Sequence, residues 1–258
     1  MIRPFFEEID TFTPSVSVDC VVFGYQENDL NVLLLKFKNV DAWAIPGGFV
    51  PHDKRMEEVV HSVLKERTGL ENIFLQQFHT FSAPDRGWDS TEISKKAFQQ
   101  VMKDWNGKEA EIVKNWLKQR FISTAYIALI NSEAIEPIPD HASDLCTWVP
   151  IKNLPSLILD HAEIIEKALV HIREKARYLP IGRSLLPERF TMYQLQVLYE
   201  AITGKTVDRG NFHHKVMSLK VLQRHGKKMN GAQNKAPFVY SIKTDIYSKL
   251  LEKGVEFL

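Results

Sequence analysis

The chain has 258 residues, of which 44% are hydrophobic and 25% charged, a balance typical of a folded globular protein long enough for two domains. Its apolar runs, such as Val32–Leu35, are too short to span a bilayer, and the acidic start at Glu7, Glu8 and Asp10 does not resemble a secretory signal. We therefore expect a cytoplasmic protein without a membrane partner.

The net charge of +1 conceals two parts of opposite sign. Residues 180–258 contain 13 Lys and Arg against 6 Asp and Glu, a net charge of +7, whereas residues 1–179 contain 20 against 26, a net charge of −6. The excess of Lys and Arg over Asp and Glu is strongest in residues 205–243. It predicts that this segment binds a polyanionic partner, although a solvated basic surface would have the same composition. Cys20 and Cys146 are too few for a disulfide framework or a Cys-rich zinc site, and we expect both in the core.

The first half of the chain predicts strands and one amphipathic helix. Residues 16–25 and 31–37 are rich in Val and Leu and predict two strands joined by a turn. Trp43–Phe49 contains Pro followed by two Gly and predicts a loop. Apolar residues at helical spacing predict a helix over Met56–Thr68 that ends at Gly69.

Three further strands and a long helix complete the first domain. The strands are predicted near residues 73–81, 122–130 and 146–150, and Asp160 is placed as the N-cap of the helix. Strands, a helix, more strands and a second helix in this order describe an α/β or α+β domain.

Residues 88–119 interrupt this pattern of strands. Apolar side chains recur at helical spacing from Ile93 to Trp105, and a second periodic stretch runs from Ile112 to Leu117. The spacing predicts a helical hairpin inserted between two strands. Its apolar stripe is expected to be buried either against the parent domain or against a partner.

The segment from Gly48 to Leu70, together with the preceding Trp43…Pro46-Gly47, resembles the Nudix box. Of the specified positions in that signature, this chain keeps five: Gly48, Leu64, Glu66, Gly69 and Leu70. The other four hold Lys54, Ser62, Val63 and Arg67, where the family has Glu, Arg, Glu and Glu. The resemblance implies that the Nudix fold is kept while most of its chemical positions have changed.

In the Nudix family, carboxylates at the positions of Val63, Glu66 and Arg67 lie on one helix face and bind Mg²⁺ that bridges a diphosphate. Here one position is apolar and another is a cation, and Glu66 alone cannot hold a catalytic metal. We therefore expect no catalytic residues, no metal, no cofactor and no pyrophosphohydrolase activity. The alternative is a Nudix hydrolase of ADP-ribose or a related nucleoside diphosphate that draws its metal from Glu57, Glu58 or a remote carboxylate.

The C-terminal segment predicts a winged helix-turn-helix. A T-x-x-Q capping box at Thr191 begins a helix that ends at Gly204, and a second helix is expected over Arg209–Met217. The basic residues 224–228 and a strand at 238–242 then supply a wing.

This segment closely resembles the C-terminal domain of the Nudix-related transcriptional regulators, through Leu185-Leu186-Pro187 and through the run from Asp208 to Lys215. The resemblance covers essentially the whole chain apart from the insertion at 88–119. It implies an α+β protein in which a Nudix α/β/α sandwich with an inserted helical hairpin precedes a winged helix-turn-helix domain. The expected boundaries are 1–158 for the effector-sensing domain, 159–182 for a linking helix and 183–258 for the DNA-binding domain. A Nudix protein with an appended dimerisation domain is the structural alternative.

The resemblance also implies the partners of the protein: double-stranded operator DNA and a small-molecule effector. Members of the family respond to ADP-ribose and control nicotinamide-cofactor metabolism, or respond to sugars such as arabinose and control their catabolism. We expect a bacterial transcription regulator that acts as a homodimer. A protein-interaction scaffold is a further possibility, but it leaves the basic C-terminal charges unexplained.

Candidate site residues follow from the same resemblance. The effector is expected to contact residues at the mouth of the Nudix domain, namely Lys36, Trp43, Gly48, Phe49, Glu66, Arg67, Asp85 and Arg86. DNA is expected to contact Arg209, Asn211, His213, His214 and Lys215 on the second helix and Lys227 and Lys228 in the wing. His213 and His214 stand where the family usually has Arg or Lys. The plainer alternatives are core positions for Trp43 and Phe49 and a surface ion pair for Asp85 with Arg86.

Overall fold

The computed structural model describes residues 8–132, 135–140, 143–176, 185–227, 236–243 and 245–246. The chain divides into two compact units. The first unit holds the described residues up to Phe23 together with Val32–Ala128 and Glu136–Ala168, and the second holds Gly24–Asn31, Leu129–Ile135 and the described residues from Leu169 onward. Within the described ranges, no helix combines the length and apolar composition needed to cross a bilayer.

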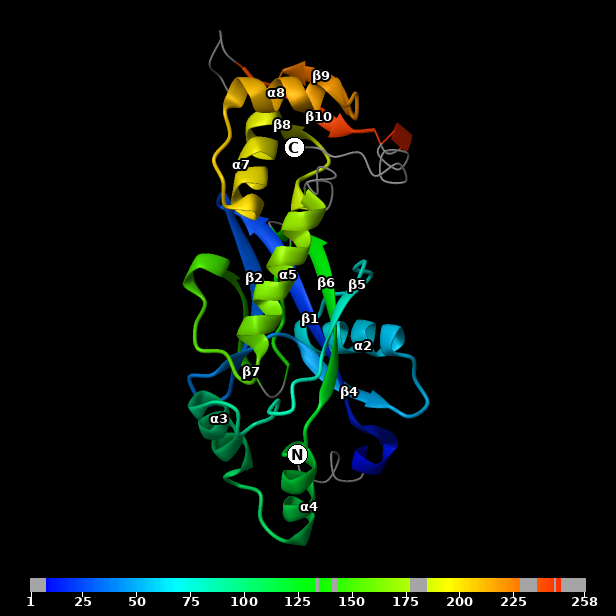
Figure 1. Cartoon of the computed structure of the whole chain (residues 1–258), viewed down its shortest axis with the longest axis vertical. Coiled ribbons are helices and arrows are strands. Elements are labelled where there is room, and N and C mark those ends of the chain that lie inside the picture. Colours follow the sequence, from blue (N-terminus) through cyan, green and yellow to red (C-terminus); the bar gives the residue numbers. More distant parts are fainter. Residues whose placement is uncertain are drawn as a thin grey trace. The chain divides into compact units, whose positions relative to one another are not determined.

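A seven-stranded sheet forms the core of the N-terminal part. Its strands are β1 (Phe12–Gln26), β2 (Asp29–Phe37), β3 (Trp43–Ala44), β4 (Gly47–Pro51), β5 (Gln76–Phe81), β6 (Ile122–Ile130) and β7 (Ser143–Pro150). Five of them follow the order β3-β2-β1-β6-β5, while β4 pairs with β1 and β7 pairs with β2. Figure 1 shows the long strands β1, β2 and β6 with α2 (Met56–Thr68) near β4. Helix α2 has the predicted bounds and ends in a left-handed Gly69.

The loop predicted over Trp43–Phe49 is wrong, because β3 and β4 occupy most of it. Gly47 pairs with Asp19 of β1, and a Cβ atom on Gly47 would clash with Asp19 Oδ1. A Cβ atom on Gly48 would lie 2.6 Å from Val63 Cγ2. Both glycines are therefore required by close neighbours within a strand, a cause that a sequence rule for turns does not distinguish.

Of the other strands predicted in this sheet, β6 has the predicted bounds, and the rest are present with shifted ends. The hairpin of β1 and β2 turns at Glu27 and Asn28, whose φ angles of 53° and 66° match the primed turns that fit twisted strands. Strand β5 begins at Gln76, three residues later than predicted, and β7 begins at Ser143, three residues earlier.

The inserted helical hairpin is confirmed as α3 (Glu92–Met102) and α4 (Lys108–Leu117). Buried side chains from both helices, Phe98, Met102, Val113 and Leu117, form one cluster with Ile9. Most of the apolar stripe is therefore packed against the parent domain, the first of the two expected solutions, whereas Val101 and Ile112 stay exposed.

Helix α5 (His161–Ala176) follows Asp160 as predicted, and Asp160 O accepts the hydrogen bond from Ile164 N that begins the helix. The Asp160 carboxylate, however, is engaged by Arg86. The predicted linking helix over 159–182 corresponds to α5, and residues 177–182 lie outside the described ranges.

The C-terminal part is a winged helix, as predicted. Its elements are β8 (Phe190–Thr191), α7 (Met192–Thr203), α8 (Arg209–Ser218), β9 (Leu222–Lys227) and β10 (Phe238–Ile242), with sheet order β8-β10-β9. The Thr191–Gln194 capping box is formed, and Gly204 ends α7 in a left-handed conformation. Asp208 begins α8 by accepting a 2.8 Å hydrogen bond from Asn211 N. Figure 1 labels these elements in yellow to red.

Both cysteines are free and buried, which confirms the expectation that they lie in the core. Burial raises the pKa of the Cys20 thiol and raises that of Cys146 to about 12. Both thiols therefore stay protonated near neutral pH, where the thiolate is the reactive form.

Candidate functional site

A cavity lies in the first unit beside β1, β4 and the inserted hairpin. Its volume is ≈ 130 Å³. Its apolar walls include Phe37, Phe49, Trp88, Leu117 and Phe121, and its polar groups include Ser17, Asp19, Arg67, Arg86, Gln119 and His161. Apolar walls with a few polar groups are typical of small-molecule sites.

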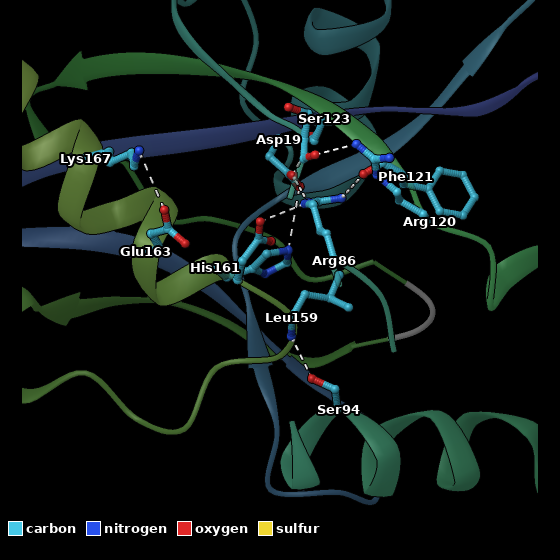
Figure 2. Close-up of polar contacts among 12 residues, drawn as sticks. Asp19, Arg86, Ser94, Arg120, Phe121, Ser123, Leu159, His161, Glu163 and Lys167 are labelled. Carbon is cyan, nitrogen blue, oxygen red and sulfur yellow. Dashed lines mark hydrogen bonds and ion pairs between the residues drawn. The ribbon is translucent and has the colours of Figure 1, made fainter. Parts of the chain in front are cut away.

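Arg86 organises the polar end of this cavity. Its side chain is 3% exposed, and its Nη2 and Nε each donate a 2.8 Å hydrogen bond, to Asp19 Oδ2 and Asp160 Oδ2 respectively. Arg86 Nη1 donates to Phe121 O at 3.2 Å, and Ser123 Oγ donates to Asp19 Oδ2 at 2.6 Å. Figure 2 shows Arg86 reaching from its loop into this group of acceptors. A buried guanidinium with these partners is a fixed part of the wall.

His161, at the start of α5, adds a neutral group to the same end. Its Nδ1 accepts a 3.3 Å hydrogen bond from Ile45 N, and its Nε2 lies 3.7 Å from Asp19 Oδ1. Burial lowers the pKa of His161, although the Asp19 charge opposes that effect. The imidazole is therefore neutral near pH 7, with its proton on Nε2 facing Asp19.

The helix positions where the Nudix family has metal-binding carboxylates do not supply carboxylates to the cavity. Val63 is buried against Gly48, and Arg67 forms an ion pair with Asp140. Glu66 is exposed and is absent from the cavity wall. Among the described residues, no group of three His, Cys, Asp or Glu side chains has the arrangement of a metal site.

Four of the predicted effector-contacting residues line the cavity: Gly48, Phe49, Arg67 and Arg86. The other four, Lys36, Trp43, Glu66 and Asp85, do not. Lys36 instead lies 3.4 Å from Asp41 and has its Nζ 5.7 Å from the Trp43 ring centroid. The alternative of a surface ion pair for Asp85 with Arg86 is wrong, because Arg86 is buried and its partners are Asp19 and Asp160.

Several cavity residues were missed by sequence reasoning, notably Asp19, Trp88 and His161. Asp19 carried a usable signal, because it is an acid within the apolar strand β1 and a buried charge requires a partner. Trp88 was assigned to the insertion, and its place in the wall depends on how that insertion folds back.

The predicted DNA-contacting residues of α8 share its solvent side. Arg209, Asn211, His213, His214 and Lys215 are exposed, while Phe212 and Val216 are buried. Lys227 is exposed at the end of β9, and Lys228 lies outside the described residues. The helix thus offers a polar face while its apolar face holds it on the domain.

Residues 182–242 match the family model of the NrtR DNA-binding winged helix domain. The chain is 26% identical over 228 residues to the ADPR responsive transcriptional repressor NtrR of Acinetobacter baylyi, a match covering 84% of this chain and 78% of that protein. It is also 38% identical over 76 residues to an ADP-ribose pyrophosphatase of Methanocaldococcus jannaschii, which covers 28% of this chain and 43% of that enzyme.

The structure of Shewanella oneidensis NrtR has the same fold. The match covers 95% of this chain and 98% of the Shewanella chain, with a TM-score of 0.65 and 24% sequence identity. The same protein complexed with a 27mer DNA covers 94% and 97%, with a TM-score of 0.65 and 23% identity. Residues 182–242 therefore match the NrtR DNA-binding winged helix domain, and the chain as a whole is similar in sequence to a transcriptional repressor and has the fold of NrtR.

Proposed function

We propose that this DNA-binding regulator responds to a small molecule held in the cavity of its first unit, and that the cavity does not hydrolyse it. The observation that carries the proposal is the pair Val63 and Arg67. One packs on Gly48 and the other pairs with Asp140, at two helix positions where hydrolysis would require metal-binding carboxylates. The rival function is hydrolysis of ADP-ribose or a related nucleoside diphosphate.

An ADP-ribose-like nucleotide is the first candidate effector. The Acinetobacter relative is named as ADPR responsive. The rings of Phe49, Trp88 and Phe121 supply aromatic surface for a base or a ribose. The cavity volume of ≈ 130 Å³ lies below the range of about 300–1,000 Å³ usual for small-molecule sites, so a nucleotide would fill it with only part of its length.

A sugar such as arabinose is the second candidate, favoured by the charge balance of the cavity wall. Arg86 is paired with Asp19 and Asp160, and Arg67 is paired with Asp140. A diphosphate needs cations or a metal to replace its hydration. The hydroxyl groups of a neutral sugar can instead bond to carboxylates and a neutral histidine.

Thermal unfolding with ADP-ribose or L-arabinose added tests both candidates. A ligand that binds the folded protein raises Tm, and we expect one of the two to do so. Trp88→Ala should abolish the shift because its ring lines the cavity, while Phe74→Ala, at an 83% exposed position outside the cavity, should keep it. A parent Tm that neither ligand moves, together with consumption of ADP-ribose in the presence of Mg²⁺, would support the hydrolase.

We infer that operator DNA is read by α8 and held by the wing. The contacting residues would be Arg209, Asn211, His213, His214 and Lys215, with Lys227 and Lys228 on backbone phosphates. Two copies of the chain would bind two half-sites of an inverted repeat. The genes controlled would follow the effector, nicotinamide-cofactor metabolism for a nucleotide and sugar catabolism for a pentose.

A further inference from the structure

The wing carries one aromatic ring with two cations against it. Phe238 of β10 is half-buried, and the guanidinium carbon of Arg224 lies 3.3 Å from its ring centroid. Lys227 Nζ lies 5.6 Å from the same centroid. Arg224 and Lys227 are both exposed. At such a short separation a guanidinium stacks on the ring, where dispersion and the ring quadrupole both favour the cation.

An irregular strand register brings both cations to this ring. Phe238 and Tyr240 are two residues apart on β10, while their partners on β9, Lys227 and Arg224, are three residues apart. Residues three apart on a regular strand point to opposite faces. The extra residue is a β-bulge, which returns Arg224 and Lys227 to the same face as the ring.

The two positive charges are not neutralised within the described part of the domain. The ion pairs among the described residues all lie in the first unit, and none involves Arg224 or Lys227. Two like charges held beside one ring repel each other, and an aromatic face compensates only part of that repulsion. An oxyanion between them would satisfy both, and the phosphates of the DNA bound by this domain are such oxyanions.

We propose that Phe238 is a positioning residue for DNA binding, whose ring holds Arg224 and Lys227 so that both contact backbone phosphates. Stacking leaves the N–H edge of the Arg224 guanidinium free to donate while it restricts the rotamers of the long side chain. Less conformational entropy is then lost when DNA binds. This role depends on the winged helix alone and not on the identity of the effector.

Affinity for DNA of arbitrary sequence tests the proposal, because phosphate contacts do not depend on sequence. The measurement is fluorescence anisotropy of a labelled random-sequence duplex, titrated with the full chain at several NaCl concentrations. Phe238→Leu should weaken binding about two- to fivefold, the change that corresponds to a cation–π contact of ~0.5–1 kcal/mol. Phe238→Tyr should restore parental affinity, because its ring also accepts a cation.

A double-mutant cycle separates positioning from support of the fold. Arg224→Ala with Lys227→Ala should lower the slope of log affinity against log salt by about 0.9 for each lost phosphate contact. Phe238→Leu removes no charge and should leave that slope nearly unchanged. In the background that lacks both cations, Phe238→Leu should cost no further affinity, because the ring has nothing left to position.

Val239→Ala is the control for truncation on β10, since Val239 is the neighbour of Phe238 on the alternate face and pairs with Thr191 of β8. It should leave DNA affinity at the parental value. The proposal is overturned if Phe238→Leu weakens binding equally with and without the two cations, or if it weakens binding no more than Val239→Ala. Should Phe238→Leu fail to fold, Phe238→Met replaces it, with circular dichroism as the check.

Discussion

At the scale of single residues, the cavity depends on one buried arginine. Arg86 has two carboxylate partners, Asp19 and Asp160, and all three side chains are at most 18% exposed. Removing one member of a buried ion network leaves the others without compensation, which costs far more than the intact network contributes. Arg86 is therefore expected to act first on stability and only then on ligand binding.

We predict that Arg86→Ala lowers the free energy of unfolding by about 3–5 kcal/mol, because two buried carboxylates lose their cation. The measurement is equilibrium unfolding in urea. Arg120→Ala is the matched control, since Arg120 is exposed and its guanidinium donates to the carbonyl of Ser82. Its cost should stay within ~0.5 kcal/mol, as at most surface positions. An equal decrease in the free energy of unfolding for the two variants would show that the Asp19–Arg86–Asp160 network stabilises the fold no more than a surface contact does.

Because His161 is buried, we predict that the protein becomes less stable in mild acid. Its pKa in the folded protein is lowered by burial, so below about pH 6.5 the unfolded chain takes up a proton that the folded protein does not. His171 contributes in the same direction, because burial lowers its pKa too. The free energy of unfolding should therefore fall as the pH decreases from about 7.5 to 5.

His161→Asn isolates this contribution, since an amide oxygen can still accept the hydrogen bond from Ile45 N. Thermal unfolding across the same pH range should show a shallower dependence in the variant than in the parent. Identical pH profiles for the variant and the parent would mean that His161 does not cause the loss of stability at low pH.

Most of the cavity residues that could be predicted from the sequence lie in a linear motif, whereas those that could not are brought together only by the fold. Gly48 and Phe49 were found because a linear motif contains them. Asp19 and His161 meet only when β1 and the start of α5 are brought together, a contact between distant parts of the chain. Glu66 was expected in the cavity from the motif alone, but the helix turns that side chain to solvent.

At the scale of secondary-structure elements, local chemistry predicted helices better than short strands. The Thr191–Gln194 box and Gly204 fix both ends of α7 through hydrogen bonds within a few residues. Strands β3 and β4 contain glycines that a sequence rule assigns to turns, and only pairing with neighbouring strands makes them regular. The inserted hairpin was recognised by periodicity, whereas its contribution to the cavity wall was not.

The cap of α7 gives a direct test of this local encoding. Thr191→Ala should destabilise the winged helix by about 1 kcal/mol, because the hydroxyl that accepts from Gln194 N is lost. Thr203→Ala serves as control, since that hydroxyl donates back to Tyr199 O within the same helix and accepts only a long, exposed 3.4 Å hydrogen bond from Lys205 N, contacts worth little to the helix. Denaturation followed by circular dichroism measures both. A cost for Thr203→Ala as large as that for Thr191→Ala would contradict the capping account.

At the scale of the whole molecule, the charge division of the sequence agrees with the order of the domains. The part with a net charge of −6 contains the cavity, and the part with +7 contains the winged helix. A polyanion is attracted to the second part and repelled by the first. The sequence alone could indicate this division, but the effector depends on side chains that meet only in the folded cavity.

We predict that the regulator is a homodimer, because winged helices that read inverted repeats bind as symmetric pairs. Light scattering at micromolar concentration should give twice the chain mass of 29.8 kDa. A single-chain mass both alone and with DNA would contradict the prediction.

The affinity for duplex DNA in the presence of a cavity ligand tests the central claim most directly. Anisotropy titrations would be run with and without ADP-ribose or L-arabinose, with Mg²⁺ present, and the ligand would then be recovered and quantified. The account predicts that one ligand changes the Kd for DNA by about 5- to 150-fold, the usual size of an allosteric coupling, and is recovered intact. A Kd that neither ligand changes, with ADP-ribose consumed at about 1 s⁻¹ or faster, would contradict it and identify an enzyme.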